Sequence, residues 1–445
     1  MAIIQSTLPR TVLSESPITL NIVDSGSVPT NSSYQFVSDL YLWKGDYTTD
    51  KPTTPTYTLS KFPIQTTSGA YIAKFDFSPL IDSAMSGSLM DTYSPELFED
   101  VEQNIYWYSV EGYSKWYEGQ TLITSSHRLA NDGEATIALN GFNLWGERAG
   151  ELAAAFNGLS GNYWSFSSSV DNYPILSIAP NVTQSLVRTD LPYYYSVYTH
   201  KDGITGLPLD PSGSNNPNQP QPIWAIAVGE NGFVSSSLWD VPTVPNLSDS
   251  NQIVRNLRLN PNTMQALGND IRILVTDASF NQIGSSVKLT FDCTKKYTPI
   301  RIIFKNRYGA FDQFDFSLVS RNTFNTSTRT FKTNALNSSN NLGNSYDVFK
   351  GSQTYFSEGS QTLTVNSDYV DESFNEFFKG LLVSDEIYWA TGPNPYTDIT
   401  FQNVGADVLP LTVTSTSTQL KTKEVDKLIQ YSFTFEISTP YKLTL

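Results

Sequence analysis

The final strand-like stretch of the chain, residues 428–437, alternates apolar and polar side chains without a fault. Because successive side chains of a β-strand point to opposite faces, this pattern predicts a strand with one buried and one exposed face. The same period of two recurs in residues 271–275 and 287–293. The apolar members of the final stretch are Ile429, Tyr431, Phe433, Phe435 and Ile437. The predicted fold is therefore mainly β, with several antiparallel β-sandwich domains of the immunoglobulin or fibronectin type and a few short helices.

A chain of 445 residues is longer than a single hydrophobic core usually supports, so several domains are expected. The sequence pattern predicts a fibronectin-like β-sandwich over residues 1–90 and a second β-rich region over 91–165. A central β-domain with a long loop at residues 205–222 follows over 166–290. Residues 291–445 are predicted to form a C-terminal β-domain for docking or assembly.

Short helices are predicted at three places, and the acidic stretch over residues 91–102 is interpreted as a further short helix or a loop. Asn143 is a suitable cap for a helix over residues 143–156, which contains three consecutive alanines. Ser78 and Pro79 are predicted to be the cap and first residue of another helix. Residues 371–382 carry an apolar face at helical spacing. A polar stretch at residues 325–345 is interpreted as either a domain boundary or an insertion.

The net charge of −15 argues against a nucleic-acid partner. The charge is uneven: residues 1–290 hold 14 Lys and Arg against 27 Asp and Glu, whereas residues 291–445 hold 14 against 16. A near-neutral C-terminal third can pack against protein neighbours. No apolar run is long enough to span a membrane, and the first 20 residues do not resemble a signal peptide.

Catalytic and metal-binding patterns are weak. The two histidines, His127 and His200, lie beside turn signals and lack ligand-like neighbours, and the single cysteine, Cys293, is expected in a core. Two groups of acids are candidates for the carboxylate pair of a glycosidase, and neither has a pattern specific to such a site. They are Asp312 with Asp315, in a strand expected to expose alternate residues, and Asp371 with Glu372 and Glu376. We therefore predict no enzyme activity, no cofactor and no metal site.

Clustered aromatic side chains are the better candidates for binding. Rings stack on sugars and also dominate protein interfaces. Because a strand cannot turn consecutive rings to one face, some of these rings must face outward or be covered by another element. Trp107 and Tyr195 are expected in the core. The candidate interface or glycan contacts are Tyr106, Tyr108, Tyr113, Trp116, Tyr117, Tyr193 and Tyr194.

One tetrapeptide occurs twice, as Phe75-Asp76-Phe77-Ser78 and as Phe314-Asp315-Phe316-Ser317. Each copy is followed two residues later by an aliphatic side chain, Leu80 or Val319. In an aromatic-rich chain four matched letters are a hint of internal duplication, and chance recurrence is the alternative interpretation.

The C-terminal third contains the run 299–312, Pro-Ile-Arg-Ile-Ile-Phe-Lys-Asn-Arg-Tyr-Gly-Ala-Phe-Asp, followed by Phe314-Asp315-Phe316. Later come residues 381–388 and 427–436, and the chain opens with Ser16-Pro17-Ile18 and Asp39-Leu40-Tyr41-Leu42-Trp43. Together these segments resemble virion structural proteins of tailed phages of Bacteroidetes, including crAss-like phages. The resemblance covers about the first hundred and the last hundred and fifty residues.

This resemblance implies a neck, tail or baseplate component that is made in the host cytoplasm and located in the virion. It would assemble with copies of itself and with other virion proteins into a symmetric ring, which requires two complementary surfaces on each subunit. The alternative hypothesis is a receptor- or glycan-binding phage protein that uses the clustered rings. A third is a polysaccharide hydrolase acting through Glu376.

Overall fold

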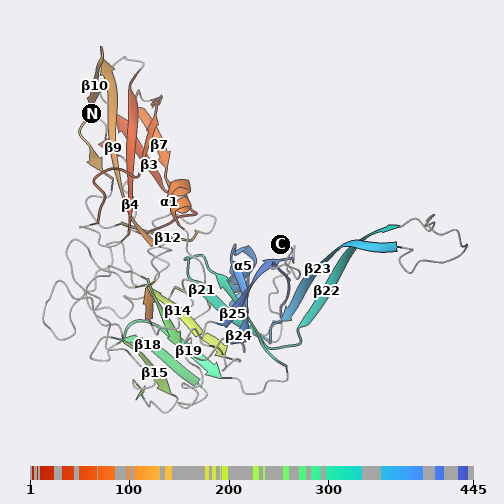
Figure 1. The fold of residues 1–445 in the computed structure, drawn as a ribbon. Helices are drawn as coiled ribbons and strands as arrows, with labels where there is room; N and C mark the ends of the chain where they lie inside the picture. The colour runs from red at the N-terminus through yellow and green to blue at the C-terminus, as the bar shows by residue number, and fades with distance from the viewer. Residues whose placement is uncertain are drawn as a thin grey trace, which may run out of the picture.

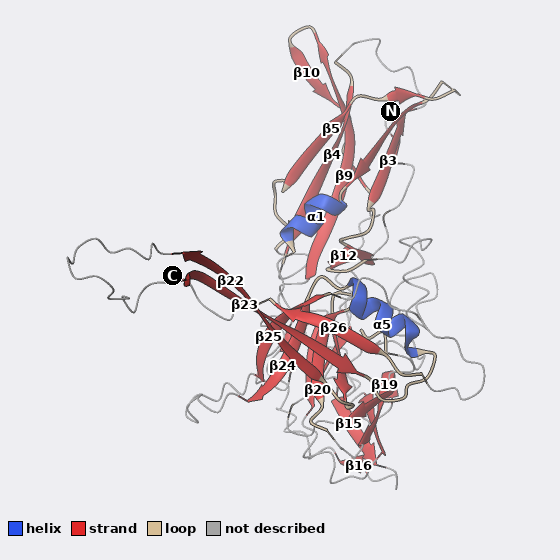
Figure 2. Ribbon diagram, turned by 90° about the vertical axis from the view of Figure 1, so that its right-hand side faces the viewer, coloured by secondary structure: helices blue, strands red, loops and turns tan. Residues whose placement is uncertain are grey.

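The computed structural model shows a mainly β protein with an upright N-terminal domain, a β-rich body and a ribbon that extends sideways (Figures 1 and 2). The structure describes residues 3–4, 8, 11–24, 33–44, 50–67, 69–85, 98–100, 105–130, 136–142, 176–179, 183–186, 191, 193–198, 224–229, 234–235, 254–259, 270–276, 282–291, 297–332, 352–393, 406–414 and 429–438.

The N-terminal domain is a sandwich of two sheets. One sheet has the order β1-β3-β7-β6, with β1 at Ile3–Ile4, β3 at Thr19–Asp24, β7 at Tyr71–Asp76 and β6 at Ile64–Gln65. The other has the order β2-β12-β9-β4-β5, with β2 at Thr11–Leu13, β12 at Thr136–Leu139, β9 at Ile105–Glu118, β4 at Gln35–Trp43 and β5 at Tyr57–Lys61. Two short strands, β10 (Thr121–Thr124) and β11 (Arg128–Leu129), also pair with β9. Apolar side chains of β3, β7, β4 and β9 form one buried core between the sheets.

This sandwich does not coincide with the predicted division between residues 90 and 91. Strand β4, from the first predicted region, pairs with β9, from the second, along nine residues. The pairing is not purely antiparallel either, because β12 runs parallel to β2. Helix α1 (Ser78–Ala84) follows β7 and is capped by Phe77, one residue before the predicted cap. Asp76 accepts a hydrogen bond from the Ser78 backbone N–H, 3.1 Å away, which takes up a donor at the helix start.

The central region contains two small sheets. The five-stranded sheet has the order β13-β19-β18-β15-β16, formed by Thr183–Leu186, Gln282–Phe291, Asp270–Thr276, Trp224–Gly229 and Val234–Ser235. The three-stranded sheet joins β14 (Tyr193–Tyr198), β17 (Val254–Leu259) and β8 (Phe98–Asp100). Strand β8 comes from the predicted second region, so long-range pairing again crosses a predicted boundary.

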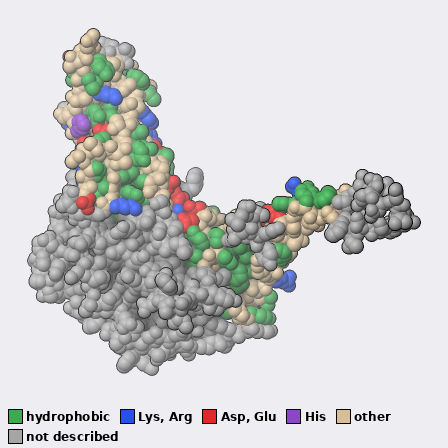
Figure 3. Space-filling model, in the orientation of Figure 1, with side chains coloured by type: hydrophobic (Ala, Val, Ile, Leu, Met, Phe, Trp, Pro, Cys, Tyr) green, Lys and Arg blue, Asp and Glu red, His purple; other side chains and the backbone are tan. Residues whose placement is uncertain are grey.

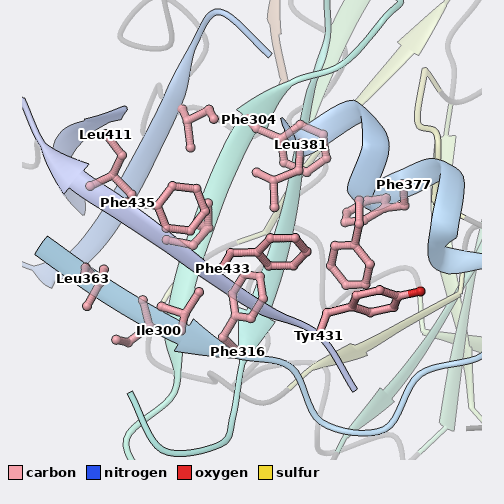
Figure 4. Packing of buried hydrophobic residues seen from close by; sticks show 14 of the residues in the cluster. Ile300, Phe304, Phe316, Leu363, Phe377, Leu381, Leu411, Tyr431, Phe433 and Phe435 are labelled. Atoms are coloured by element: carbon pink, nitrogen blue, oxygen red, sulfur yellow. The ribbon is translucent and has the colours of Figure 1, made fainter. Parts of the chain in front are cut away.

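The C-terminal domain is built on a seven-stranded sheet of order β21-β20-β24-β25-β26-β23-β22. These strands span Phe311–Phe316, Ile300–Lys305, Ile387–Pro393, Ala406–Val413, Ser432–Ile437, Ser352–Asn366 and Arg321–Lys332. Helix α5 (Phe374–Val383) covers one face, and its Phe377, Phe378 and Leu381 pack with Phe433 and other sheet residues (Figure 4). This domain is thus a sheet covered by a helix, because the apolar stripe predicted at residues 371–382 takes the place of a second sheet.

The predicted period of two is confirmed in the final strand. Tyr431, Phe433, Phe435 and Ile437 are buried, and Ile429 forms an isolated bridge with Val370. The predicted helix at residues 143–156, the loop at 205–222, His200 and Cys293 lie outside the described residues. Among the residues that the structure describes, no helix is long and apolar enough to cross a membrane.

Candidate docking arm and domain junction

The most exposed element of the described chain is a two-stranded ribbon that continues β22 and β23 beyond the sheet. Only residues 362–366 of β23 pair with β26, whereas β22 pairs with β23 from Arg321 out to Lys332. From the Phe324–Gln361 pair outward, no third strand pairs with the ribbon among the residues that the structure describes. We call β22 together with residues 352–361 of β23 the arm. It projects away from the body in both ribbon views (Figures 1 and 2).

Four large rings on the arm are exposed to solvent. Phe324, Phe331 and Phe356 are 46%, 45% and 41% exposed, and Tyr355 is 64% exposed. All twelve residues of β22 are exposed. The space-filling view shows hydrophobic side chains along the arm with basic side chains near them (Figure 3). Rings and cations on one exposed ribbon are the residue types that anchor protein interfaces.

One ring of the arm contacts another, and one contacts an arginine. Phe331 and Tyr355 have ring centroids 6.1 Å apart. The Arg329 guanidinium lies 5.6 Å from the ring centre of Phe356. Phe324 lies over Gly359, where an added Cβ would come within 2.5 Å of the ring. Glycine at this position therefore allows the tip of the ring to approach the backbone closely.

A buried polar network holds the base of the C-terminal sheet to the central region. Arg301, on β20, is completely buried, and its Nε lies 2.8 Å from Oδ1 of Asp315 on β21. The guanidinium also stacks on the Tyr193 ring, 3.7 Å from its centre, and donates to the Leu191 carbonyl at 3.2 Å. The Tyr193 hydroxyl donates to Asp315. Burial raises the pKa of the Tyr193 hydroxyl, so it stays protonated as the donor of that bond.

Asp312, the other acid considered with Asp315 as a glycosidase pair, serves the same junction. It accepts hydrogen bonds from the Ile178 backbone N–H and from the Asn306 side chain, each at 2.9 Å, and from the Ser177 hydroxyl. Burial raises the pKa of Asp312, although these donors oppose the shift. The prediction that this strand exposes alternate residues is wrong for both acids, which point to opposite faces of the sheet. Ser177 and Ile178 cover Asp312, whereas Tyr193 contacts Asp315 on the other face.

The turn between β20 and β21 forms the contact with the N-terminal sandwich. Gly309 has φ +78°, and an added Cβ would lie 2.1 Å from the Asn140 carbonyl oxygen. The Phe142 backbone N–H donates to the Arg307 carbonyl at 2.9 Å. Lys305 Nζ lies 3.0 Å from Glu15 Oε1 and 3.3 Å from Asp385 Oδ2. Burial alone would lower the pKa of Lys305, but the hydrogen bond to Glu15 and the charge of Asp385 raise it overall.

The predicted binding rings do not form one platform. Tyr108 and Tyr193 are buried, so the prediction that they contact a partner is wrong. Tyr108 lies in the core of the N-terminal sandwich, and Tyr193 lies against Arg301 in the buried polar network. Tyr106 is partly buried, with Lys44 Nζ 4.8 Å from its ring centre. Tyr113 stacks on His127, with their ring centroids 4.0 Å apart. The ring centroids of Trp116 and Tyr34 are 6.0 Å apart. Tyr117 is 49% exposed, and the side chain of Tyr194 lies outside the described residues. Trp107 and Tyr195 are buried as predicted.

The remaining residues that were candidates for catalysis or metal binding have structural contacts. His127 lies 3.4 Å from Glu111, Asp371 accepts from the Ser373 N–H before α5, and Glu376 pairs with Lys379 on that helix. No group of three or more His, Cys, Asp or Glu suited to a metal ion occurs in the part of the chain that the structure describes.

The arm rings are the candidate residues that sequence reasoning missed. The sequence of residues 325–345 indicates a polar stretch, but its first eight residues belong to β22. A usable signal was present: threonine- and phenylalanine-rich segments flank an Asn- and Ser-rich stretch, which is typical of two strands joined by a turn region.

Comparisons with known proteins add no family. No protein-family model matches the chain, and no curated protein matches it. Among solved structures, it is similar to dimeric latent PorU from Porphyromonas gingivalis, at 8% identity and a TM-score of 0.18, covering 81% of this chain and 31% of that one. The chain thus spans about a third of the length of that protein. A TM-score this low carries no argument about fold or function.

Proposed function

We propose that this chain is a non-enzymatic structural component of a tailed-phage virion, placed in the neck, tail or baseplate and assembled through protein–protein contacts. The observation that carries the proposal is the β22–β23 arm. A two-stranded ribbon without further packing is at best marginally stable in water. Its four exposed rings therefore gain most when a protein surface covers them.

The use of the acids supports a structural role. Asp312 and Asp315, the two acids considered as a glycosidase pair, are occupied by structural contacts. Asp315 forms an ion pair with Arg301 on the neighbouring strand, and hydrogen bonds from Ser177 and Tyr193 join each acid to a segment more than a hundred residues away. Neither carboxylate is exposed to a substrate. Such residues are used for fit between segments, as an assembly scaffold requires.

The test is the composition and structure of purified phage particles from the host that carries this gene. Mass spectrometry should find the chain in particles at a constant ratio to the other virion proteins, and cryo-electron microscopy should show density for the N-terminal sandwich and the arm. Particles that contain no such chain would contradict the proposal. An abundant host cytoplasmic protein, measured in the same preparation, controls for contamination.

Glycan binding remains the second candidate because Tyr117 and Leu122 are directly opposed on β9 and β10 and are both about half exposed. Binding of the isolated chain to a glycan array, lost in Tyr117→Ala and kept in Tyr355→Ala, would favour this alternative. Loss only in Tyr355→Ala would instead place the contact on the arm.

A further inference from the structure

We propose that the arm of one chain docks on the N-terminal sandwich of a second copy of the same chain. This inference rests on the proposed assembly function and names the partner of the arm. The charges of the two surfaces, their exposed apolar side chains, the direction of the arm and the symmetry of the contact all favour this docking.

The charges of the two surfaces are complementary. The arm carries three cations, Arg321, Arg329 and Lys332, and one acid, Glu358. Residues 1–142, which contain the sandwich, carry seven Lys and Arg against sixteen Asp and Glu. Opposite net charge steers two surfaces together and disfavours contacts between like surfaces. The acidic N-terminal part of another copy is thus a suitable acceptor for a cationic ribbon.

The sandwich also exposes apolar side chains that can receive the arm rings. Phe62 is 62% exposed and Ile64 is 72% exposed, and both lie where β5 and β6 form the edges of their sheets. Tyr117 and Leu122 form a second exposed pair on β9 and β10. An arm with exposed rings and an acceptor with exposed aliphatic and aromatic groups can bury both sets of apolar surface.

The direction of the arm makes this contact intermolecular. Within one chain the arm and the N-terminal sandwich leave the body in different directions (Figures 1 and 2). The arm therefore reaches a sandwich only on a neighbouring copy. A contact between two different surfaces repeats from copy to copy, so it closes a ring or extends a filament.

A symmetric arm-to-arm dimer is disfavoured by the same charges. Such a dimer would bring the cations of two arms, Arg321, Arg329 and Lys332 of each copy, into one interface. β22 is an edge strand, and basic side chains on an edge are a known way to prevent pairing between identical edges. The cations thus select against arm–arm pairing while they favour an acidic acceptor.

The first experiment reverses the arm charges in the full-length chain. We expect the double variant Arg329→Glu, Lys332→Glu to weaken self-association at least about tenfold at near-physiological salt, measured by analytical ultracentrifugation. The control variant Arg272→Glu, Lys379→Glu makes the same change in net charge at exposed positions away from the arm and should associate like the wild type. Circular dichroism checks that both variants fold. Equal weakening in the two variants would overturn the proposal.

The second experiment maps the contact directly. A benzophenone photocrosslinker replaces Tyr355, the most exposed ring of the arm, and the variant is mixed with isotopically labelled chain so that links between copies can be recognised. We expect intermolecular crosslinks to peptides within residues 1–142. Crosslinks confined to the arm or C-terminal domain of the second copy would overturn the proposal. A chain that stays monomeric at about 100 μM, far above the Kd of a specific interface, would overturn it too.

The inference and the proposed function fail in different ways. If the chain is present in particles but its arm crosslinks there to another virion protein, the inference is wrong and the virion role stands. If the chain is absent from particles but self-associates through the arm and sandwich, the virion role is wrong and the inference stands.

Discussion

Strands β20 and β22 belong to the same seven-stranded sheet and have opposite surroundings. All six residues of β20 are buried, whereas all twelve of β22 are exposed. Each strand carries an arginine. Arg301 of β20 is buried in contact with Asp315 and Tyr193, whereas Arg329 of β22 lies over the exposed ring of Phe356. One sheet thus has a part that holds domains together and a part that is available to a partner. The comparison predicts that mutations in β20 change stability, whereas mutations in β22 change association.

The largest effect is expected for Arg301→Met. This change leaves Asp315 buried without its cation, and removing one partner of a buried ion pair costs about 3–5 kcal/mol. Urea unfolding followed by fluorescence measures the loss. The control is Lys379→Met, which removes an exposed pair with Glu376 and should change stability by less than about 0.5 kcal/mol. Similar losses in the two variants would contradict the structural role of the buried network.

Matched phenylalanine deletions test the comparison most directly. Phe433, on β26, is completely buried against α5, so Phe433→Ala should cost about 3 kcal/mol or more. Phe331→Ala, on the arm, should change the unfolding free energy by no more than about 0.5 kcal/mol, because its ring is already exposed. Sedimentation should show the reverse order for self-association. A large stability loss in Phe331→Ala would mean that the arm ring packs within its own chain.

A smaller effect is expected for Gly309→Ala at the contact between the C-terminal sheet and the N-terminal sandwich. Gly119, with φ +65° and open space around its Cα, is the matched control, because Ala there meets only the backbone penalty of about 1–2 kcal/mol. At Gly309 the added methyl also collides with the Asn140 carbonyl. Gly309→Ala should therefore lose more stability and increase protease cleavage between the domains. Equal losses at both glycines would show that the close contact is not needed.

The smallest effect concerns the Lys305–Glu15 pair. The pKa of Lys305 is raised above its ordinary value of 10.5, so the folded state favours the protonated form. Its contribution to stability is fully present below pH 10.5 and is lost as the pH rises through the folded-state pKa. Because Glu15 is about one third exposed, the contribution should be about 1 kcal/mol or less. Urea midpoints of the wild type should fall more steeply with pH in this range than those of Glu15→Gln; parallel curves would rule out the pair as the cause.

The repeated tetrapeptide shows how far sequence reasoning reaches. Asp76 and Asp315 have the same neighbours, Phe before and Phe-Ser after. Asp76 is exposed and accepts hydrogen bonds at the start of α1, whereas Asp315 is buried in an ion pair. The tetrapeptide sequence predicts a strand in both places. It cannot predict whether the acid is buried, because the burial of Asp315 depends on the distant segment that contains Tyr193.

Local periodicity alone was sufficient for the mainly β class, the alternation of the final strand and the apolar face of α5, since these depend on neighbours within a few residues. Sheet partners, the pairing of β4 with β9 in one sandwich, the burial of Asp312 and Asp315 and the exposure of the arm depended on tertiary structure. Each of these is set by contacts between residues far apart in the chain, and the same threonine- and phenylalanine-rich strand is equally compatible with a core or with solvent until its neighbours are in place.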